Sequence, residues 1–249
     1  MEQAPELTEA IHYSKAPIIE ALIDIQIGGL PGDALEALKA IHLSGYALPQ
    51  RMGLFTGEFK ISESKPVASA TDNHIGFRFE SGDKKYVLQA RLNGFTISRL
   101  APYESWEPFV SEAKTAWAAY REAVGNVAIT QVSVRYINKI HMPPASEMKL
   151  YLRTTPEISP DLPQMLSGIF MRLEIPYTQP PALLVHQQFY APPDEPGQIG
   201  LFLDNEVRAG CSLESISDSD LWDRIEELRD VKNQAFRGCL TKKMEEILA

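Results

Sequence analysis

The tripeptide Glu58-Phe59-Lys60 is the stretch of this chain that most resembles a catalytic motif. A Glu-x-Lys on a strand, with an acidic residue upstream, is typical of metal-dependent nucleases, in which carboxylates hold Mg²⁺ and the lysine polarises the attacking water. Asp24 or Asp33 can provide the upstream acid. An ordinary strand with one exposed face also contains such tripeptides. A metal-dependent hydrolase or nuclease, with Glu58 and Lys60 in its site, is therefore the least favoured of the three functions that we consider.

Four polar residues on strands that we expect at the centre of a sheet form a candidate polar site: Glu20, Asp24, Arg135 and Asn138. Glu20 and Arg135 both lie on the less apolar faces of their strands. If those strands are neighbours, a cross-strand ion pair joins the two residues. Such a pair can be a structural brace or the polar floor of a pocket, and the sequence leaves both interpretations open.

The five histidines do not form a local metal-binding motif. No two of them lie within five residues of each other, so neither a helix nor a hairpin presents a pair to a metal ion. The sequence also lacks the phosphate-binding loop, the dinucleotide-binding turn and the nucleophile elbow. We therefore predict no catalytic residue, no metal site and no cofactor. Asp204 and Glu206 share one face of an expected strand, which we interpret as a solvated surface.

The composition is that of a globular protein with an acidic excess. The 249 residues include 24 basic and 33 acidic side chains, which gives a formal net charge of −9. Negative charge repels phosphate backbones, so nucleic acid is an unfavoured partner, although arginines on the expected sheet faces allow a local basic patch. No apolar run is long enough to span a membrane, and the acidic N-terminus does not read as a signal peptide. With only Cys211 and Cys239 as cysteines, the sequence favours a cytoplasmic location.

The elements that position these residues alternate between strands and amphipathic helices. Strands are indicated by apolar residues at every second position, and helices by apolar residues at intervals of three and four. Asn93-Gly94 predicts a tight hairpin turn. In chain order we predict a strand at 18–27, a helix at 33–42, strands at 51–61, 74–80, 85–92 and 95–100, a helix at 105–124, a strand at 128–142, a short helical turn near 161–166, strands at 169–175, 183–190 and 199–207, and one helix at 217–248.

This order predicts an α+β fold made of two similar halves. The halves read β-α-β-β-β-β-α and β-(short α)-β-β-β-α, each with an antiparallel sheet packed on a long helix. The order matches TATA-binding-protein-like and helix-grip folds, which is an analogy of topology alone. We divide the chain into an N-terminal arm (1–17), a first half (18–142), a Pro-rich connector (143–163) and a second half (164–249), which together form one structural unit.

Several short segments resemble a known protein family. They are Ala16–Ile25, Pro102–Trp106, Arg135–Ile140, Phe202–Asp204 and Asn233–Phe236. The family is sporadically distributed in bacteria and archaea, has about this length and has no characterised function. The resemblance spans essentially the whole chain and implies a single-unit protein, but it provides no catalytic residues. The patchy distribution implies horizontally moving genes, as in defence or toxin–antitoxin systems.

These observations favour a cytoplasmic, non-enzymatic protein-interaction or accessory component. The polar strand faces are mixed in sign and rich in hydrogen-bonding groups, which suits a protein partner better than a phosphate backbone. The alternative is a small-ligand-binding protein of the helix-grip type, in which sheet and helix enclose a cavity. Homo-oligomerisation through exposed sheet edges is compatible with either function.

Overall fold

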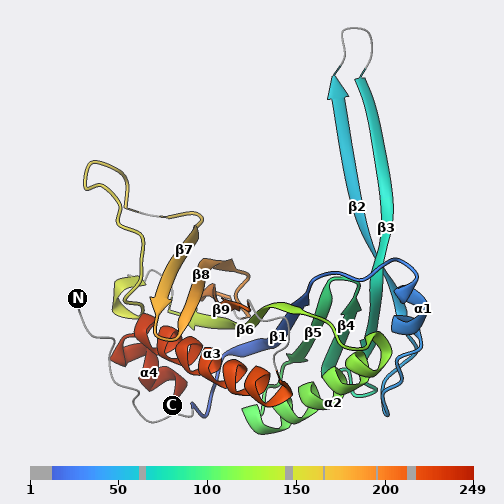
Figure 1. Ribbon diagram of the computed structural model, residues 1–249. Helices are drawn as coiled ribbons and strands as arrows, with labels where there is room; N and C mark the ends of the chain where they lie inside the picture. The colour runs from blue at the N-terminus through green and yellow to red at the C-terminus, as the bar shows by residue number, and fades with distance from the viewer. Residues whose placement is uncertain (1–12, 62–65, 144–147, 165, 195, 212–216) are drawn as a thin grey trace.

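Nine strands form a single antiparallel sheet in the computed structural model. The structure describes residues 13–61, 66–143, 148–164, 166–194, 196–211 and 217–249. For residues 55–61 and 66–70 it describes the backbone alone. The strands are β1 (Ile18–Ile27), β2 (Gln50–Ile61), β3 (Pro66–Glu80), β4 (Tyr86–Arg91), β5 (Gly94–Leu100), β6 (Ile129–Met142), β7 (Phe170–Thr178), β8 (Pro181–Ala191) and β9 (Ile199–Gly210). Their spatial order is β2-β3-β4-β5-β1-β6-β9-β8-β7 (Figure 1). The central pair, β1 and β6, joins strands that are far apart in the sequence.

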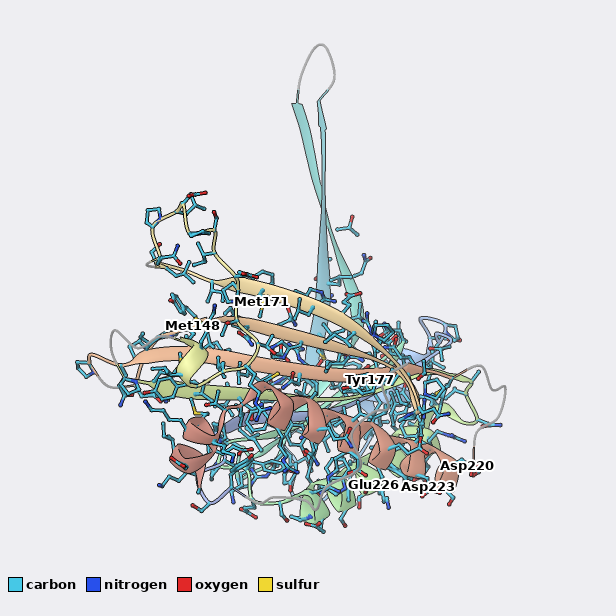
Figure 2. All side chains as sticks on the ribbon, turned by 90° about the vertical axis from the view of Figure 1, so that its left-hand side faces the viewer. Met148, Met171, Tyr177, Asp220, Asp223 and Glu226 are labelled. Carbon is cyan, nitrogen blue, oxygen red and sulfur yellow. The ribbon has the colours of Figure 1, made fainter. Side chains whose placement is uncertain are left out.

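The long helices cover one face of this sheet. The helices are α1 (Ala34–Lys39), α2 (Trp106–Val124), α3 (Asp218–Cys239) and α4 (Lys242–Leu248), with a 3₁₀ turn η1 at Met148–Leu150. Helix α2 packs on β5, and α3 packs on β6, β8 and β9. Seen from the side, sheet and helices form two layers (Figure 2). The expected α+β class with an antiparallel sheet is therefore confirmed.

The sheet has two chemically different faces, which follow from the alternation of residues along β1. Ile23 and Ile25 are fully buried on the side covered by α2 and α3, which we call the helix face. Glu20 and Asp24 alternate with them and lie on the opposite side, which we call the open face. The main core on the helix face is centred on an aromatic cluster of Phe95, Trp117 and Tyr120. None of the described helices is long and apolar enough to cross a membrane.

Strands β2 and β3 form a two-stranded ribbon that projects from the sheet (Figure 1). β3 pairs with β4 only over Gly76–Glu80, whereas it pairs with β2 along its length back to Pro66. β3 is therefore longer than the expected strand at 74–80. Its first residues lack the apolar alternation that predicts a strand, and their extended conformation depends on pairing with β2. Gly76 lies where β3 leaves the sheet, and a Cβ there would lie 2.1 Å from the carbonyl oxygen of Ala90.

The hairpin between β4 and β5 is confirmed, but its turn is displaced by one residue. Arg91 pairs with Gly94, so Leu92 and Asn93 form the turn and Gly94 begins β5. Gly94 has φ 153°, and a Cβ there would lie 2.5 Å from the carbonyl oxygen of Ile25. The close approach of β1, rather than the turn itself, therefore requires glycine at this position.

The single helix expected at 217–248 is wrong, because the chain forms α3 and α4 instead. Leu240 between them is extended, fully buried, and paired in an isolated bridge with Leu152. The hydroxyl of Thr241 then accepts the main-chain N–H of Met244 and begins α4. The short helical turn expected near 161–166 is a simple turn over its described residues, in which the N–H of Leu162 donates to Ser159.

Candidate functional site

Arg135 on the open face pairs with Asp204 and not with Glu20 as expected. Its Nε and Nη2 donate to the two carboxylate oxygens of Asp204 at 2.8 and 2.5 Å. The hydrogen bonds to Asp204, and then the charges of Asp204, Glu206 and Glu20, raise the pKa of the guanidinium, although burial opposes the shift. The interpretation of Asp204 as a solvated carboxylate is wrong, because its side chain is only 2% exposed. In this register Arg135 lies opposite Leu22, which leaves Glu20 in a diagonal position.

Asp24 belongs to a second ion pair on the open face. Its Oδ1 accepts hydrogen bonds from Arg91 Nη2 at 2.6 Å and from Thr96 Oγ1 at 2.5 Å. Arg91 Nη1 also donates to Thr96 Oγ1 at 2.6 Å. The network links β1, β5 and β4, so it braces the sheet. The two arginines thus already have carboxylate partners within the protein.

Asn138 lies on the other side of the sheet from Glu20, Asp24 and Arg135. It is three residues from Arg135 along β6, and residues an odd number apart point to opposite faces of a strand. Its side chain is 2% exposed on the helix face, and Nδ2 donates to the carbonyl oxygen of Leu203 at 3.2 Å. The structure therefore does not bring the four residues of the candidate polar site together.

The residues of the hydrolase hypothesis are also separated by the topology. Glu58 and Lys60 lie on β2, at the edge of the sheet, opposite Ser69 and Val67 of β3. Asp24 lies on β1, beyond β3, β4 and β5. Within the ranges that the structure describes, no three His, Cys, Asp or Glu side chains form a group that could hold a metal ion.

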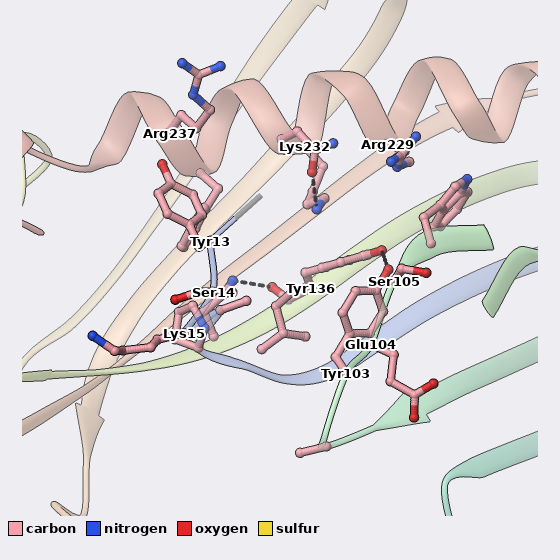
Figure 3. Close-up of a pocket in the computed structure, with 18 of the residues that line it drawn as sticks. Tyr13, Ser14, Lys15, Tyr103, Glu104, Ser105, Tyr136, Arg229, Lys232 and Arg237 are labelled. Atoms are coloured by element: carbon pink, nitrogen blue, oxygen red, sulfur yellow. Dashed lines mark hydrogen bonds between the residues drawn. The ribbon is translucent and has the colours of Figure 1, made fainter. Parts of the chain in front are cut away.

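A cleft of about 820 Å³ opens on the helix face between α3, the start of α2 and the chain segment that leads into β1 (Figure 3). Residues of the segment 13–18 form one wall, and Tyr103 and Tyr136 lie at its base. Trp106 and Phe236 add aromatic surface from α2 and α3. Asn138 also lines the cleft, so one residue of the predicted polar site contributes to it.

Lys232 is the most unusual side chain of this cleft. It comes from α3, is 5% exposed, and its Nζ lies 3.3 Å from the centroid of the Tyr136 ring. The amine donates a hydrogen bond to Asn233 Oδ1 at 2.6 Å. Burial drives the pKa of Lys232 well below its ordinary value; the charge of Arg229 lowers it further, whereas Asp230 opposes the shift. Among the described residues, no carboxylate forms an ion pair with this amine.

Two phenols form the base of the cleft beneath Lys232. The hydroxyl oxygens of Tyr103 and Tyr136 are 2.6 Å apart, so one donates to the other. Burial raises the pKa of Tyr103 to about 12, although the hydrogen bond with Tyr136 opposes the shift. The pKa of Tyr136 is raised well above its ordinary value, mainly by burial. Both groups are therefore neutral at physiological pH, and the pair retains one O–H that can donate to a ligand.

A second buried polar cluster lies where β8, β9 and the end of α3 meet. His186 Nδ1 is 2.6 Å from Asn205 Oδ1, and Cys239 Sγ is 3.9 Å from both ring nitrogens of His186. Burial raises the pKa of the Cys239 thiol and lowers that of His186. These shifts favour the neutral thiol and the neutral imidazole, whereas a cysteine nucleophile needs the thiolate. The geometry therefore does not favour nucleophilic catalysis.

The sequence contains a signal for the cleft, namely polar residues at positions where the apolar pattern predicts core residues. Residues 221, 225, 228, 235 and 239 form the apolar stripe of α3, and Lys232 occupies the stripe position between 228 and 235. Asn138 likewise interrupts the buried alternation of β6. Two polar residues at core positions therefore meet at one cleft. A signal of this kind marks a site before the structure is known.

Four of the five segments quoted for the family resemblance contribute to the cleft walls: Ala16–Ile25, Pro102–Trp106, Arg135–Ile140 and Asn233–Phe236. No protein-family model matches the chain, and no curated protein is similar to it in sequence. The family resemblance therefore stays a prediction.

Proposed function

We propose that this chain is a cytoplasmic, non-enzymatic binding protein that holds a small molecule in the helix-face cleft. The observation that carries the proposal is the buried amine of Lys232, which lies in a cleft of about 820 Å³ with aromatic and amide walls. Ligand sites are typically concave, largely apolar and equipped with a few convergent polar groups. The two free thiols, Cys211 and Cys239, agree with a reducing compartment.

The groups around Lys232 fit the binding of a ligand better than acid–base catalysis. The phenols of Tyr103 and Tyr136 have raised pKa values, so they act as hydrogen-bond donors rather than as bases. Glu104 at the rim is held by Lys85 and Arg99, which lower its pKa. The groups at the cleft are therefore suited to recognise a ligand.

The position of the cleft agrees with the proposed two-half, TATA-binding-protein-like arrangement. In that arrangement β5 of the first half and β9 of the second half each lead into a long helix, α2 and α3. The cleft takes residues 13–17 from the N-terminal arm, residues 18, 101–107, 136 and 138 from the first half, and residues between 229 and 237 from the second half. A cleft at the seam of two halves is a common place for a ligand.

Fluorine NMR on 5-fluorotryptophan tests the proposed function. The chain has three tryptophans, of which Trp106 lines the cleft, whereas Trp117 and Trp222 do not. A phenylalanine variant of each residue assigns its resonance. We expect members of a fragment collection to shift the Trp106 resonance and to leave that of Trp117 unchanged. The proposal fails if no fragment shifts Trp106, or if all three resonances shift together.

A protein partner is the second candidate function, and the projecting β2–β3 ribbon favours it. The part of a two-stranded ribbon that extends beyond its sheet is marginally stable in water. A protein partner that covers the ribbon would stabilise it. Binding of this kind is what we expect if the chain is an accessory component of a defence or toxin–antitoxin system. The test is co-expression with the products of adjacent genes. We expect the full chain to retain one of them and a variant with residues 55–72 replaced by a short turn to lose it; equal retention would contradict this function.

A further inference from the structure

A buried ammonium group requires a counter-ion, and none of the carboxylates that the structure describes forms an ion pair with Lys232. A charge removed from water is costly unless an opposite charge or several hydrogen bonds compensate for it. Within the described part of the chain, Lys232 Nζ donates a hydrogen bond to Asn233 and contacts the face of the Tyr136 ring. The ring attracts a cation, but burial outweighs this attraction and favours the neutral amine.

Two of the carboxylates that line the cleft, Glu104 and Glu107, are engaged elsewhere. Glu104 pairs with Lys85 at 3.1 Å and with Arg99 at 3.2 Å. Glu107 accepts hydrogen bonds from its own main-chain N–H and from the Ser105 hydroxyl, which lower its pKa.

Two further acids lie on the helix that carries Lys232. Glu226 accepts hydrogen bonds from Trp106 Nε1 at 2.6 Å and from Arg229 at 3.3 Å. Asp230 acts on Lys232 through its charge, and burial raises the pKa of Asp230.

Among the described residues, Lys232 therefore faces the cleft with no carboxylate in ion-pair contact, although the charge of Asp230 acts on it. Lys15 on the N-terminal segment and Arg229 on α3 line the cleft together with Lys232. Arg229 lies 5.0 Å from the Trp106 ring centroid, next to the cleft. The tyrosine pair at the base retains one O–H to donate. These groups lie beside aromatic walls that fit an apolar or planar body.

We propose that the cleft binds a small organic anion, whose carboxylate or phosphate group is the counter-ion of Lys232 and whose apolar body packs between the aromatic walls. This inference rests on the proposed function and names its ligand class. The anion stabilises the ammonium form of Lys232, so one proton is taken up as the complex forms: the neutral amine, a proton and the anion give an ion pair. No covalent bond forms or breaks. Binding is therefore expected to weaken as the pH rises.

The probes are benzoate and benzamide, which have nearly the same shape and differ in charge, and phenyl phosphate, which separates carboxylate from phosphate recognition. Each is titrated into 5-fluorotryptophan-labelled protein between pH 6 and pH 9, and the Trp106 resonance is followed. The groups that face Lys232 are Tyr13, Lys15, Glu104, Glu107, Arg229, Asp230 and Arg237, together with the tyrosine pair. The described cleft residues include no histidine, so none of them titrates near neutral pH in its ordinary state.

We expect benzoate or phenyl phosphate to bind more tightly than benzamide, with an affinity that falls by up to about tenfold per pH unit above the native pKa of Lys232. Lys232→Met should remove this pH dependence and weaken anion binding by roughly tenfold or more. Lys243→Met is the matched control, because Lys243 lies 4.7 Å from the Tyr151 ring centroid in a similar stacked contact but outside the cleft. This control should bind as the wild type does.

The outcomes separate the two proposals. If benzamide binds as well as both anions, or if Lys232→Met binds anions with unchanged affinity, the anion inference is overturned while the Trp106 shift still supports a ligand cleft. If neither anion shifts Trp106 at any pH while neutral fragments do, the inference is likewise overturned. If no compound shifts Trp106, the proposed function fails as well.

Discussion

Replacing Lys232 by methionine is expected to stabilise the protein at neutral pH, because it removes a buried amine that no described carboxylate pairs with. Desolvation of an ammonium group costs several kcal/mol. Because burial favours the neutral amine in the native protein, the substitution removes a neutral hydrogen bond to Asn233, worth about 0.5–1.5 kcal/mol, and an amine–ring contact with Tyr136 that lacks the full charge of a cation–π pair. Methionine fills a similar volume and Asn233 can be rehydrated, so the expected gain is about 1–2 kcal/mol in the free energy of unfolding.

The pH dependence of this gain identifies its origin. The pKa of Lys232 is lowered in the native protein and is about 10.4 in the unfolded chain. Between the two pKa values the unfolded chain binds more protons, so the stability of the wild type rises with pH. The advantage of Lys232→Met must therefore shrink as the pH approaches about 10.4.

Urea unfolding followed by tryptophan fluorescence at pH 7, 8, 9 and 10 measures both quantities. The control is Lys243→Met, which should change stability by less than about 0.5 kcal/mol at every pH because Lys243 is exposed. The reasoning is refuted if Lys232→Met destabilises the protein at pH 7, or if its effect is the same at pH 7 and pH 10.

Other predictions concern the braces, the buried histidine and one glycine. Arg135→Met leaves the carboxylate of Asp204 buried without its partner and should cost about 2–4 kcal/mol in urea unfolding, much of which Asp204→Leu in the same chain should restore. Burial lowers the pKa of His186, so stability should be lost as the pH falls below about 6.5, and His186→Gln should flatten this loss in acid-unfolding curves. Gly94→Ala places a Cβ 2.5 Å from a main-chain carbonyl and should lower the melting temperature, whereas Gly28→Ala, with nothing within 4 Å, should not.

Much of the fold follows from local periodicity. The alternation along β1 and the stripe of α2 are properties of single segments, so the sequence predicts them without knowledge of the neighbours. The break at Leu240 is different, because leucine continues the helical stripe and its extended conformation depends on a bridge to Leu152. The sequence likewise predicts Gly94 as a turn residue, whereas the close contact with β1 that requires glycine depends on the strand order.

The candidate site was predictable only in part. Sequence pattern places Glu20 and Arg135 on half-polar strand faces, but strand register decides that Arg135 meets Asp204. Lys232 and Asn138 stand at core positions of two regular patterns, which is a signal that a single sequence contains. Their convergence on one cleft depends on the packing of α3 against β6, which no local pattern specifies.

The most direct test of the cleft as an anion site is the titration of Lys232 itself, followed by NMR of the lysine side-chain resonances with Lys232→Met for assignment. We predict that Lys232 titrates well below the other lysines in the free protein, and that saturating benzoate or phenyl phosphate moves its pKa upward while benzamide does not. A Lys232 that titrates with the exposed lysines near about 10.4, unchanged by either anion, would contradict the proposal.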